Sequence, residues 1–599
     1  MRRPVIHLLL AATVGWVGCS SDRGTFENES HDFANGDGGL PDAGCSGVVC
    51  SRDLRSVRDC ATGELVEECP ADKACGNGEC IAPCDAAAVN EGSVGCSFVM
   101  PPHNSRYMSA GSCAAIFVAN NWTSPATVKV EYEGEEKSLD GALWEPIVES
   151  GVLTYRKVDG PIPPGGGAIV FVSNDRSYAG DRTWTACPAG VKPIFDEEHA
   201  IFGTGFTHAI VARTDVPVSV FSVFPYGGAA EWLPSGTLVL PTTSMRKNYV
   251  LVSSWGGSGE RFGYGQLAPA PLVPPSSTGW PTLQIVATED ETSIDLLPRV
   301  PITGGGGVPS SAANEVASYK LNRGEVLQLM QNRELVGSVL ESTKPVAVFG
   351  GNTAMFVPFG ISAADTDNKQ IPPLSAWGHE YAVIIAPNRS AVLKGRATQR
   401  DPRVVRLVGA AEGTELFYEP EIPAGAPASL EAGQLAQFFA DESFVVRSQD
   451  AAHPFYAATV MVGSQVTDRL GDPETALSVP TNQWLDSYVF FTDPSYKFSL
   501  VVVSRRRSNG AFHDVTLDCA GALTDWQPIN ADYEWTYASL TRAGKPVTYP
   551  AGTCTDGTHR IHSDGPFSVT VWGLSPFASY SYPGGMGLRP VTELHVPVR

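Results

Sequence analysis

The fold is decided by the stretch Ser342-Thr343-Lys344-Pro345-Val346-Ala347-Val348, in which a turn, a proline and a short β-branched run follow one another. The same pattern recurs around Pro217, Pro454 and Pro566, so that successive prolines lie 128, 109 and 112 residues apart. Proline lacks a backbone N–H and suits the first residue of a strand, where no ladder donor is needed. The spacing predicts repeated β-modules along the chain.

The surroundings of this motif repeat as well. Residues 321–328 match residues 430–437, and residues 285–292 match residues 407–414, in the same order. A unit of this size holds roughly seven short strands, which suits a β-sandwich, whereas one propeller blade spans about 40–50 residues. Two blades per unit would also fit, which would give a β-propeller of seven or eight blades. We expect an all-β fold of repeated β-sandwich-like modules.

The composition is typical of a globular protein with several modules. Hydrophobic residues make up 43% and charged residues 18% of the 599 residues, a length that exceeds one ordinary core. The formal net charge is −22, and phosphate contacts need a basic face. The one basic cluster, Arg505-Arg506-Arg507, precedes Ser508-Asn509-Gly510 and is interpreted as a solvated hairpin tip. We expect no nucleic-acid partner.

The N-terminus carries an export signal. Arg2 and Arg3 precede an apolar run that is too short to span a bilayer comfortably. Residues 1–18 are therefore interpreted as a signal peptide. The sequence Trp16-Val17-Gly18-Cys19 resembles the lipobox of bacterial lipoproteins, which implies a lipid on Cys19 and a membrane contact through that anchor. Trp16 stands where that family usually has Leu, and the alternative is an ordinary secretory signal with an incidental Cys19. No other segment is long and apolar enough for a transmembrane helix.

The cysteines support export to an oxidising compartment. Of 13 cysteines, 12 remain when Cys19 is set aside, and an even number favours disulfides. Residues 19–44 are predicted to be a flexible tether and residues 45–96 a small cysteine-rich, EGF-like module that needs cross-links. The cysteines assigned to disulfides fall into that module and into the β region: Cys45, Cys50, Cys60, Cys69, Cys75, Cys80, Cys84 and Cys96, then Cys113, Cys187, Cys519 and Cys554.

The pairing can be predicted only in part. Residues 45–84 hold seven cysteines, so one must pair outside, most simply with Cys96; the connectivity inside the module stays open. Cys519 and Cys554 are predicted to pair with each other, which leaves Cys113 and Cys187 as the other pair. A link from Cys519 to Cys113 or Cys187 would instead mean that the two ends of the β region meet. Clustered cysteines also suggest zinc, but there is no Cys-x-x-Cys pair and no nearby His.

The sequence contains no recognisable catalytic motif. There is no His-Glu-x-x-His helix, no Gly-x-Ser-x-Gly elbow and no Walker loop. The run Glu197-Glu198-His199 is more typical of a solvated loop than of a site, His559 and His562 are expected on opposite faces of a strand, and Asp472-Pro473 is interpreted as a loop turn. We expect no enzyme activity, no cofactor and no metal.

Aromatic residues in turn-like places are the best lead to a binding surface. Most are expected in the core, and the remainder could stack on sugars or anchor a protein partner. They are Trp255, Tyr264, Trp280, Trp377, Trp484, Tyr496 and Tyr582.

Several of these stretches together resemble a known family. Phe224-Pro225-Tyr226-Gly227-Gly228, the motif at 342–348, Gly378-His379-Glu380-Tyr381 and Phe491-Thr492-Asp493-Pro494 resemble the IgGFc-binding protein N-terminal domain family, over about residues 97–599. The chain looks most like bacterial members that are lipoproteins with a cysteine-rich segment in front. The family name implies binding of immunoglobulin Fc by an animal mucus protein, and that activity does not follow, because a relative need share only the fold.

The expected function is that of a lipid-anchored extracellular binding or adhesion protein. It would present the repeated β-region at 97–599 to a protein or glycan ligand at the bacterial cell envelope, at the outer membrane or cell surface. The alternative is a structural envelope or spore-coat protein that assembles through its sheet edges. A third hypothesis, a hydrolase, would need a pocket with paired carboxylates.

Overall fold

The computed structural model describes residues 47–599, except 52–53, 105–108, 150–151, 181–182, 231–232, 257–278, 359–362 and 468. Strands make up 49% of it and helices 6%, which confirms the all-β prediction. No helix in the described part is long and apolar enough to cross a membrane. The signal peptide, Cys19, the tether and Cys45 lie outside the described residues.

Four repeats follow one another in the chain, and the bounds of their elements differ in detail. Repeat 1 contains β6 (Gly95–Met100), β7 (Ala114–Ala119), β8 (Val128–Tyr132), β9 (Glu135–Lys137), β10 (Leu143–Glu149), β11 (Val152–Lys157), β12 (Gly167–Ser173), β13 (Gly205–His208), β14 (Ile210–Phe224) and β15 (Ser235–Val239). Repeat 2 contains β16 (Arg246–Val250), β17 (Pro281–Ala287), β18 (Thr292–Leu297), β19 (Ala317–Leu321), β20 (Glu325–Met330), β21 (Val339–Met355) and β22 (Asp365–Gln370).

The other two repeats follow the same plan. Repeat 3 contains β23 (Glu380–Val383), α2 (Arg389–Lys394), β24 (Arg403–Gly409), β25 (Thr414–Glu419), β26 (Ser429–Leu430), β27 (Leu435–Ala440), β28 (Phe444–Ser448), β29 (Phe455–Met461) and β30 (Thr475–Leu477). Repeat 4 contains β31 (Leu485–Phe491), β32 (Phe498–Arg506), β33 (Val515–Leu517), β34 (Gly521–Ala522), β35 (Gln527–Pro528), β36 (Tyr533–Arg542), β37 (Lys545–Tyr549), β38 (Gly552–Cys554), β39 (Thr558–Ser575) and β40 (Ala578–Pro583).

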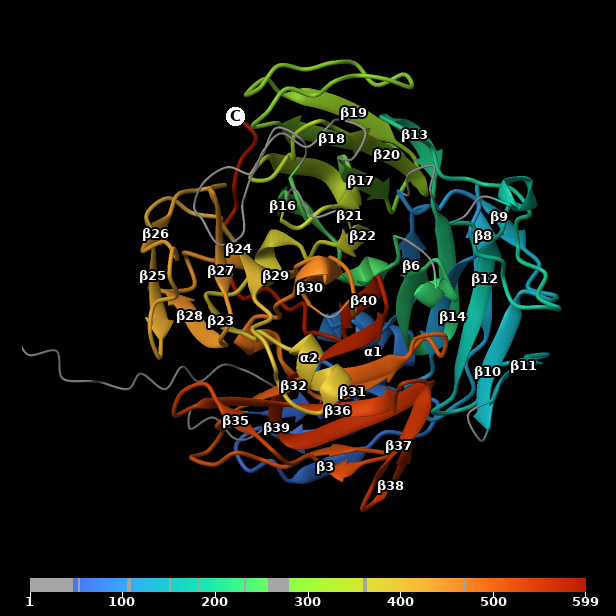
Figure 1. Ribbon diagram of the computed structural model, residues 1–599, viewed down its shortest axis with the longest axis vertical. Coiled ribbons are helices and arrows are strands. Elements are labelled where there is room, and N and C mark those ends of the chain that lie inside the picture. The colour runs from blue at the N-terminus through green and yellow to red at the C-terminus, as the bar shows by residue number, and fades with distance from the viewer. Residues whose placement is uncertain are drawn as a thin grey trace, which may run out of the picture. The chain divides into compact units, whose positions relative to one another are not determined.

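Repeats 1, 2 and 4 are each built on one long strand whose two halves pair with different strands, and in repeat 3 this long strand is interrupted. The strands β14, β21 and β39 each pair with the first three strands of their repeat and with its last strand, and β28 and β29 share these partners in repeat 3. The first and third strands pair with the N-terminal half, and the second and last strands with the C-terminal half. This arrangement gives the sandwich-like modules that the sequence favoured (Figure 1).

The motif prolines lie where the long strand changes partners. Pro217, Pro345 and Pro566 are inside β14, β21 and β39 rather than at a strand start, and Pro454 lies in the break between β28 and β29. The pairing register with the first strand jumps across the proline, for example from Phe567 to His562 in repeat 4. A missing N–H does no harm at such a jump, because the ladder is interrupted there.

A buried tyrosine joins the first strand to this point in three repeats. The hydroxyl of Tyr249 donates to the carbonyl of Val346, the residue after Pro345, at 2.7 Å. Tyr381 and Tyr488 make the equivalent bonds to the carbonyls of Phe455 and Phe567. Phe98 occupies this position in repeat 1, three residues after Gly95, which pairs with Val218.

The cysteine-rich segment precedes repeat 1. It contains β1 (Val48–Cys50), β2 (Ser56–Asp59), β3 (Leu65–Glu68), β4 (Ala74–Gly76), β5 (Glu79–Ile81) and α1 (Pro83–Asn90). Its disulfides join Cys50 to Cys75, Cys69 to Cys80 and Cys84 to Cys96. Cys60 is also disulfide-bonded. The bond to Cys96 ties α1 to β6, so the segment is covalently joined to the first strand of repeat 1.

The start and the end of the repeat region meet. Ser93 N–H donates to the carbonyl of Met586 at 2.9 Å, and Leu588 N–H donates to that of Glu91 at 2.8 Å. Cys519 is bonded to Cys554 and Cys113 to Cys187. The two ends therefore meet although no disulfide joins Cys519 to Cys113 or Cys187.

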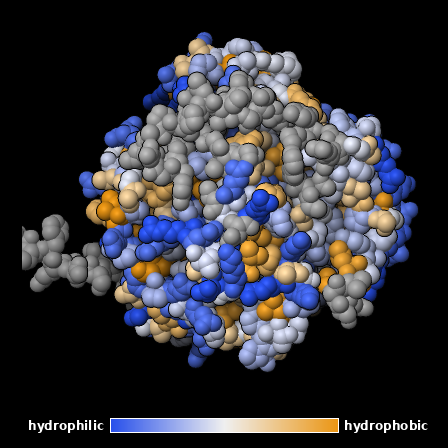
Figure 2. All heavy atoms as spheres, in the orientation of Figure 1, coloured by the Kyte–Doolittle hydropathy of each residue, from blue (hydrophilic) through white to orange (hydrophobic). Residues whose placement is uncertain are grey.

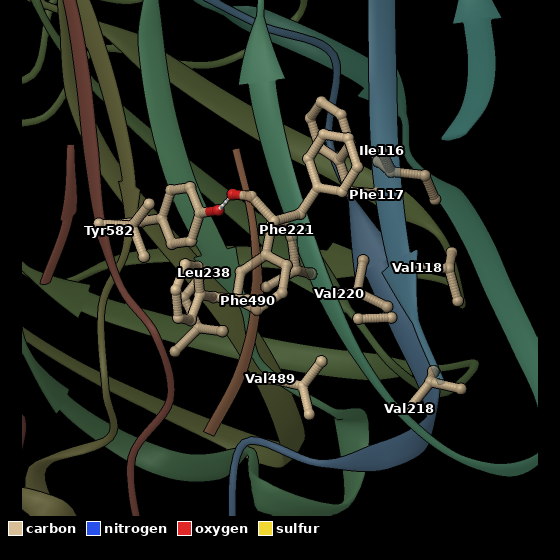
Figure 3. Packing of buried hydrophobic residues seen from close by; sticks show 14 of the residues in the cluster. Ile116, Phe117, Val118, Val218, Val220, Phe221, Leu238, Val489, Phe490 and Tyr582 are labelled. Atoms are coloured by element: carbon tan, nitrogen blue, oxygen red, sulfur yellow. Dashed lines mark hydrogen bonds between the residues drawn. The ribbon is translucent and has the colours of Figure 1, made fainter. Parts of the chain in front are cut away.

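Repeats 1 and 4 share a hydrophobic core (Figure 3). The ring of Phe117 stacks on Phe491 with 4.3 Å between centroids, and Phe221 stacks on Tyr582 at 4.8 Å. Val489 and Phe490 of β31 face the same cluster. Aromatic pairs of this kind stabilise beyond their buried area by about 0.5–1.5 kcal/mol each, so the two repeats at the ends of the region are packed as one body.

The last strands of the repeats, β15, β22, β30 and β40, lie against one another and bury ionisable side chains. Lys369 contacts the Glu474 carboxylate and donates to the carbonyl of Ser581 at 2.9 Å. Burial raises the pKa of Glu474 well above its ordinary value although Lys369 opposes it, and burial raises the pKa of Asp472 to about 6. Asp472-Pro473 lies outside the helices and strands, in the connection that leads into β30, as expected for a loop. This connection is buried: Asp472 is 2% exposed and accepts from Ser464 N–H at 2.9 Å.

Candidate binding site

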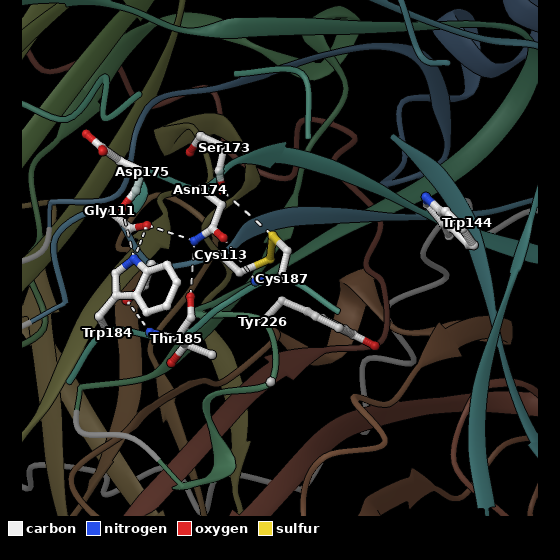
Figure 4. Close-up of a disulfide and its surroundings, with 12 residues drawn as sticks. Gly111, Cys113, Trp144, Ser173, Asn174, Asp175, Trp184, Thr185, Cys187 and Tyr226 are labelled. Atoms are coloured by element: carbon white, nitrogen blue, oxygen red, sulfur yellow. Dashed lines mark hydrogen bonds between the residues drawn. A yellow bond between two sulfur atoms is a disulfide. The ribbon is translucent and has the colours of Figure 1, made fainter. Parts of the chain in front are cut away.

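A long irregular segment, residues 174–204 between β12 and β13, forms the most distinctive part of repeat 1. The disulfide from Cys187 to Cys113, at the start of β7, fastens it to the sheet (Figure 4). The Asn174 side chain donates to the carbonyls of Gly111 and Thr185 at 2.9 and 3.2 Å. Such fastening converts a loop that would otherwise be costly to order into a fixed wall.

Trp184 and Glu198 add further fixed points to this loop. The indole N–H of Trp184 donates to the carbonyls of Gly111 and Asp175 at 2.9 and 3.0 Å. The Glu198 carboxylate accepts from the backbone N–H groups of Gly111 and Ala200 at 2.7 and 2.8 Å. Both carboxylate oxygens are thus used by backbone donors, and Glu198 holds the loop rather than presenting a free charge.

The loop walls a cavity between β6, β7, β8 and β13. The cavity has room for about 40 Å³, and together with the hollow around it that opens to solvent the empty space is about 530 Å³. Most of its lining is apolar or aromatic, and its polar groups are few. The lining includes Met100, Pro102, His103, Ala115, Ile116, Tyr132, Phe195, Glu198, His199, His208, Ile210, Ser222 and Phe224.

One wall is an aromatic and imidazole cluster around Tyr132. The Tyr132 ring lies 4.9 Å from the rings of both Phe195 and His199, and its hydroxyl is 3.1 Å from Nδ1 of His199. His208 completes the cluster and pairs with Glu133, Nδ1 to Oε1, at 3.1 Å. Burial, with the charges of Glu133 and Glu197, raises the pKa of Tyr132 to about 12, so its hydroxyl keeps its proton.

His103 lies on the opposite wall and is 7% exposed. Its ring stacks on Phe224 with 4.3 Å between centroids, and its Nε2 is 3.1 Å from the hydroxyl of Ser222. Burial lowers the pKa of His103 to about 3, so the ring is neutral at physiological pH. Within the described part of the chain, Nδ1 of His103 and Nε2 of His199 are buried without a hydrogen-bond partner.

Exposed phenylalanines lie beside the cavity. Phe206 is on β13 two residues before His208, so both side chains are on one face of the strand. Phe206 is 43% exposed, and Phe202, in the loop before it, is 51% exposed. Exposed aromatic residues next to a mostly apolar cavity are typical of a site for a protein partner.

The sequence prediction for Glu197-Glu198-His199 was right about the loop but missed the cavity, because His199 lines it. The other members, His103, Tyr132, Phe195 and His208, come from four separate segments and were also missed. Most of the aromatic residues singled out from the sequence are in the core, as expected: Trp255, Trp377, Trp484, Tyr496 and Tyr582 are at most 4% exposed. Tyr264 lies outside the described residues, and Trp280 is half-buried.

The basic cluster in repeat 4 precedes a hairpin tip, as predicted, but its first arginine is buried. Asn509 and Gly510 have φ values of 51° and 78°, and Ser508 and Ala511 bond to each other across them, which makes the hairpin tip. Arg505 is not solvated: it is 8% exposed, lies 3.8 Å above the Trp526 ring centroid and pairs with Glu534 at 2.6 Å. A stacked guanidinium keeps its charge while it buries its face.

Among the described residues one group has the spacing of a metal site, Asp518, Cys519 and His559. Cys519 is in a disulfide with Cys554, so its sulfur is not a thiolate ligand. His559 is bonded to Asp518 at 3.0 Å and is buried, whereas His562 is exposed, which agrees with the opposite faces expected for this pair. The group therefore fixes the strand β39 and offers no cation site.

A family model described as IgGFc binding protein matches residues 235–573, which is more than half of the chain. The chain belongs to the IgGFc-binding protein family. None of the curated proteins compared with it matches. The IgGFc-binding family consists of binding domains rather than enzymes, and it indicates a protein-binding, extracellular role.

The matched residues of this IgGFc-binding chain run from β15 through most of β39 and contain repeats 2 and 3 in full. The resemblance expected from sequence extends further, over residues 97–599. The cavity, formed by residues 100–224, lies N-terminal of the match. It is therefore a feature of this chain that the family match does not assign.

Proposed function

We propose that this protein is an extracellular binding protein that captures a protein partner, and that the loop-walled cavity of repeat 1 receives an anchoring side chain of that partner. The observation that supports this most directly is the combination of a cavity lined by aromatic and imidazole groups with the exposed Phe202 and Phe206 at its side. Buried aromatic anchors in well-formed pockets supply most of the energy of protein interfaces.

The proposal includes the anchor and the location predicted from the sequence. Lipid on Cys19 would hold the chain at the bacterial cell envelope, at the outer membrane or cell surface, with the repeats presented outward for adhesion. Cys19→Ser should release the protein from the membrane fraction, as measured by cell fractionation. Retention of this variant in the membrane would refute the anchor without touching the binding proposal.

The binding proposal is tested by comparing two exposed phenylalanines. Phe206→Asp should abolish capture of a partner from the native culture, because a carboxylate beside the cavity would have to be buried in the interface. Phe417→Asp is the matched control: Phe417 is also on a strand, in repeat 3, and is 46% exposed. Figure 2 shows hydrophobic surface over β25 and β26. Equal loss of capture in both variants would contradict a site at the cavity.

The alternative, a structural envelope protein, predicts a different result. Such a protein would assemble through copies of itself, so the Cys19→Ser chain would form oligomers in solution. Sedimentation of that variant as a monomer, together with loss of capture in Phe206→Asp, supports binding over assembly. Oligomers that Phe417→Asp disrupts would support assembly through repeat 3 instead.

A further inference from the structure

The last strand of repeat 2 consists of polar residues that are all buried. β22 reads Asp365-Thr366-Asp367-Asn368-Lys369-Gln370, and each of the six is at most 7% exposed. Side chains two apart share a face of a strand, so Asp367 and Lys369 lie on the same face. Lys369 is the only buried lysine among the described residues. A lysine is almost never fully buried unless its amine is paired.

The last strands of all four repeats bring groups to the amine of Lys369. Its Nζ contacts Oε1 of Glu474, which immediately precedes β30, and lies 3.3 Å from Oδ1 of Asp367. It also donates to the carbonyls of Gly236 in β15 and Ser581 in β40, the latter at 2.9 Å. One buried amine therefore faces two buried carboxyl groups, which belong to repeats 2 and 3.

The surroundings of Glu474 suit attack on its carboxyl carbon. Oε1 accepts from the backbone N–H of Ser581 at 3.0 Å, and Oε2 is buried without a hydrogen-bond partner in the described part of the chain. Burial raises the pKa of Glu474 well above its ordinary value, which favours the protonated acid. A protonated carboxyl with a hydrogen bond to its carbonyl oxygen can accept an amine, because the N–H stabilises the negative charge that develops on that oxygen.

Asp367 is placed to act as the base. Burial lowers the pKa of Lys369, but the neighbouring carboxylates outweigh burial and raise it, so the amine starts as an ammonium. An ammonium has no lone pair and must lose a proton before it can attack. Oδ1 of Asp367 lies 3.3 Å from Nζ and is itself held by the hydroxyl of Ser235 at 3.0 Å. This carboxylate can therefore take the proton over a short distance.

We propose that Lys369 and Glu474 condense to an intramolecular amide, which joins repeats 2 and 3 covalently. Asp367 takes one proton from the ammonium, and the neutral Nζ attacks Cδ of the protonated Glu474. A second proton passes from the nitrogen to the departing hydroxyl, which leaves as water. The nitrogen keeps one hydrogen and Asp367 ends protonated, so the step needs no oxidant, reductant or cofactor.

The buried position favours the amide over an ion pair. In water the separate ions are preferred, because both are well solvated, but a buried ion pair loses this solvation and regains it only in part through attraction. An amide carries no net charge, and its one N–H can still donate to the carbonyl of Ser581 or Gly236. The bond would close a loop of 105 residues in the chain. This inference goes beyond the proposed function and does not depend on it.

Peptide mapping of the full chain tests the bond. Trypsin cleaves after a lysine only when its amine is free, so a linked Lys369 would be passed over. The denatured and reduced chain should yield residues 334–389 joined to residues 470–497, lighter than the two separate peptides by one molecule of water. Cleavage after Lys369 together with a separate peptide 470–497 of full mass would overturn the proposal and leave a plain ion pair.

Three variants assign the roles. Lys369→Met keeps an unbranched side chain without the amine, so the joined peptide should disappear. Asp367→Asn keeps the shape without the base and should lower the joined fraction at least about tenfold. Asp472→Asn is the matched control, because the Asp472 carboxylate is also buried but accepts from Ser464 N–H rather than contacting Lys369. The joined peptide should persist in this variant.

The outcomes separate the bond from the role of the base. A full joined fraction in Asp367→Asn would leave the bond in place and overturn the role of Asp367. An equal loss in Asp472→Asn would overturn that role as well, since any buried carboxyl nearby would then serve. Should the variants fail to fold, the peptide map of the unaltered chain decides alone whether the amide exists.

Discussion

Repeats 1 and 3 are built on the same strand plan but differ in the connection that precedes the long strand. In repeat 3 residues 441–443 suffice to join β27 to β28, whereas in repeat 1 residues 174–204 lie between β12 and β13. Repeat 1 fixes its loop with a disulfide, and repeat 3 fixes its helix α2 with buried ion pairs. The comparison teaches that a connection between two strands can be lengthened into the wall of a cavity, provided that a cross-link limits the number of conformations of the longer loop.

The ion pairs of repeat 3 should produce the largest effect on stability. Asp401 accepts from Arg389 at 2.7 Å and from Arg403 at 2.9 Å, and all three are buried. Burial raises the pKa of Asp401, but the two arginines outweigh it and hold the pKa at about 2. Asp401→Ala should lower the free energy of unfolding by about 3–5 kcal/mol, because two buried guanidinium groups lose their counter-charge. Urea unfolding measures this.

The control for this variant is a pair on the surface of the same repeat. Arg400 is 83% exposed and pairs with Asp441 at 2.9 Å, so Asp441→Ala should cost less than about 1 kcal/mol. A loss below that value for Asp401→Ala as well would mean that carbonyl partners alone, such as Val462 for Arg389, suffice to hold the arginines.

The two disulfides of the β region should have the next largest effects on stability. Removing Cys113–Cys187, which spans 74 residues, should cost about 4 kcal/mol in the loop-entropy model, and removing Cys519–Cys554, which spans 35, about 3–4 kcal/mol. Only the first double Cys→Ala variant should also weaken capture of the partner, since only that bridge holds the cavity wall. Thermal melting and capture from the native culture test this for both variants, and equal weakening by both would contradict it.

A smaller effect is expected from the tyrosine that joins the first strand to the long strand in repeat 3. Tyr381→Phe leaves the buried carbonyl of Phe455 without its donor and should cost about 1–3 kcal/mol. Tyr537→Phe is the control, because the Tyr537 hydroxyl has no hydrogen bond within the described part of the chain; it should change stability by less than about 0.5 kcal/mol. Denaturant midpoints that do not differ between the two would show that the bond stabilises nothing.

The smallest effect concerns pH and the buried carboxyls of the last strands. Burial raises the pKa of Asp472 to about 6 from an ordinary 3.8, so the folded chain binds more protons than the unfolded chain between pH 4 and pH 6. Its contribution to stability is therefore full below pH 4 and is lost as the pH rises through 6. Between pH 7 and pH 5 the chain should gain about 1 kcal/mol that Asp472→Asn does not gain. Equal pH profiles in calorimetry would rule this out.

Local sequence patterns predicted the repeats, because the proline motif marks the point where each long strand changes partners. Tyr249, Tyr381 and Tyr488 carry a further signal. Each lies three residues after the residue that is paired or hydrogen-bonded with the one following the motif proline. Together they would have aligned repeats 2–4 without a structure.

The cavity could not be predicted in the same way. Its three histidines, at 103, 199 and 208, are not spaced regularly in the sequence, and Tyr132 lies on β8, in a different hairpin. Long-range pairing of β13 with β20 of repeat 2 places His208, and a disulfide places the loop with His199. The visible signal was indirect: about thirty residues without strand pattern between two β runs, with a cysteine inside, which is the kind of loop that carries function.

The meeting of the two ends of the repeat region also sets how the protein carries mechanical load. A pull from the N-terminal side enters at the cysteine-rich segment and passes through the Cys84–Cys96 bond into β6. Beside this point Met586 and Leu588 are hydrogen-bonded to Ser93 and Glu91. A pull that reaches this point therefore bears on the first and last repeats together.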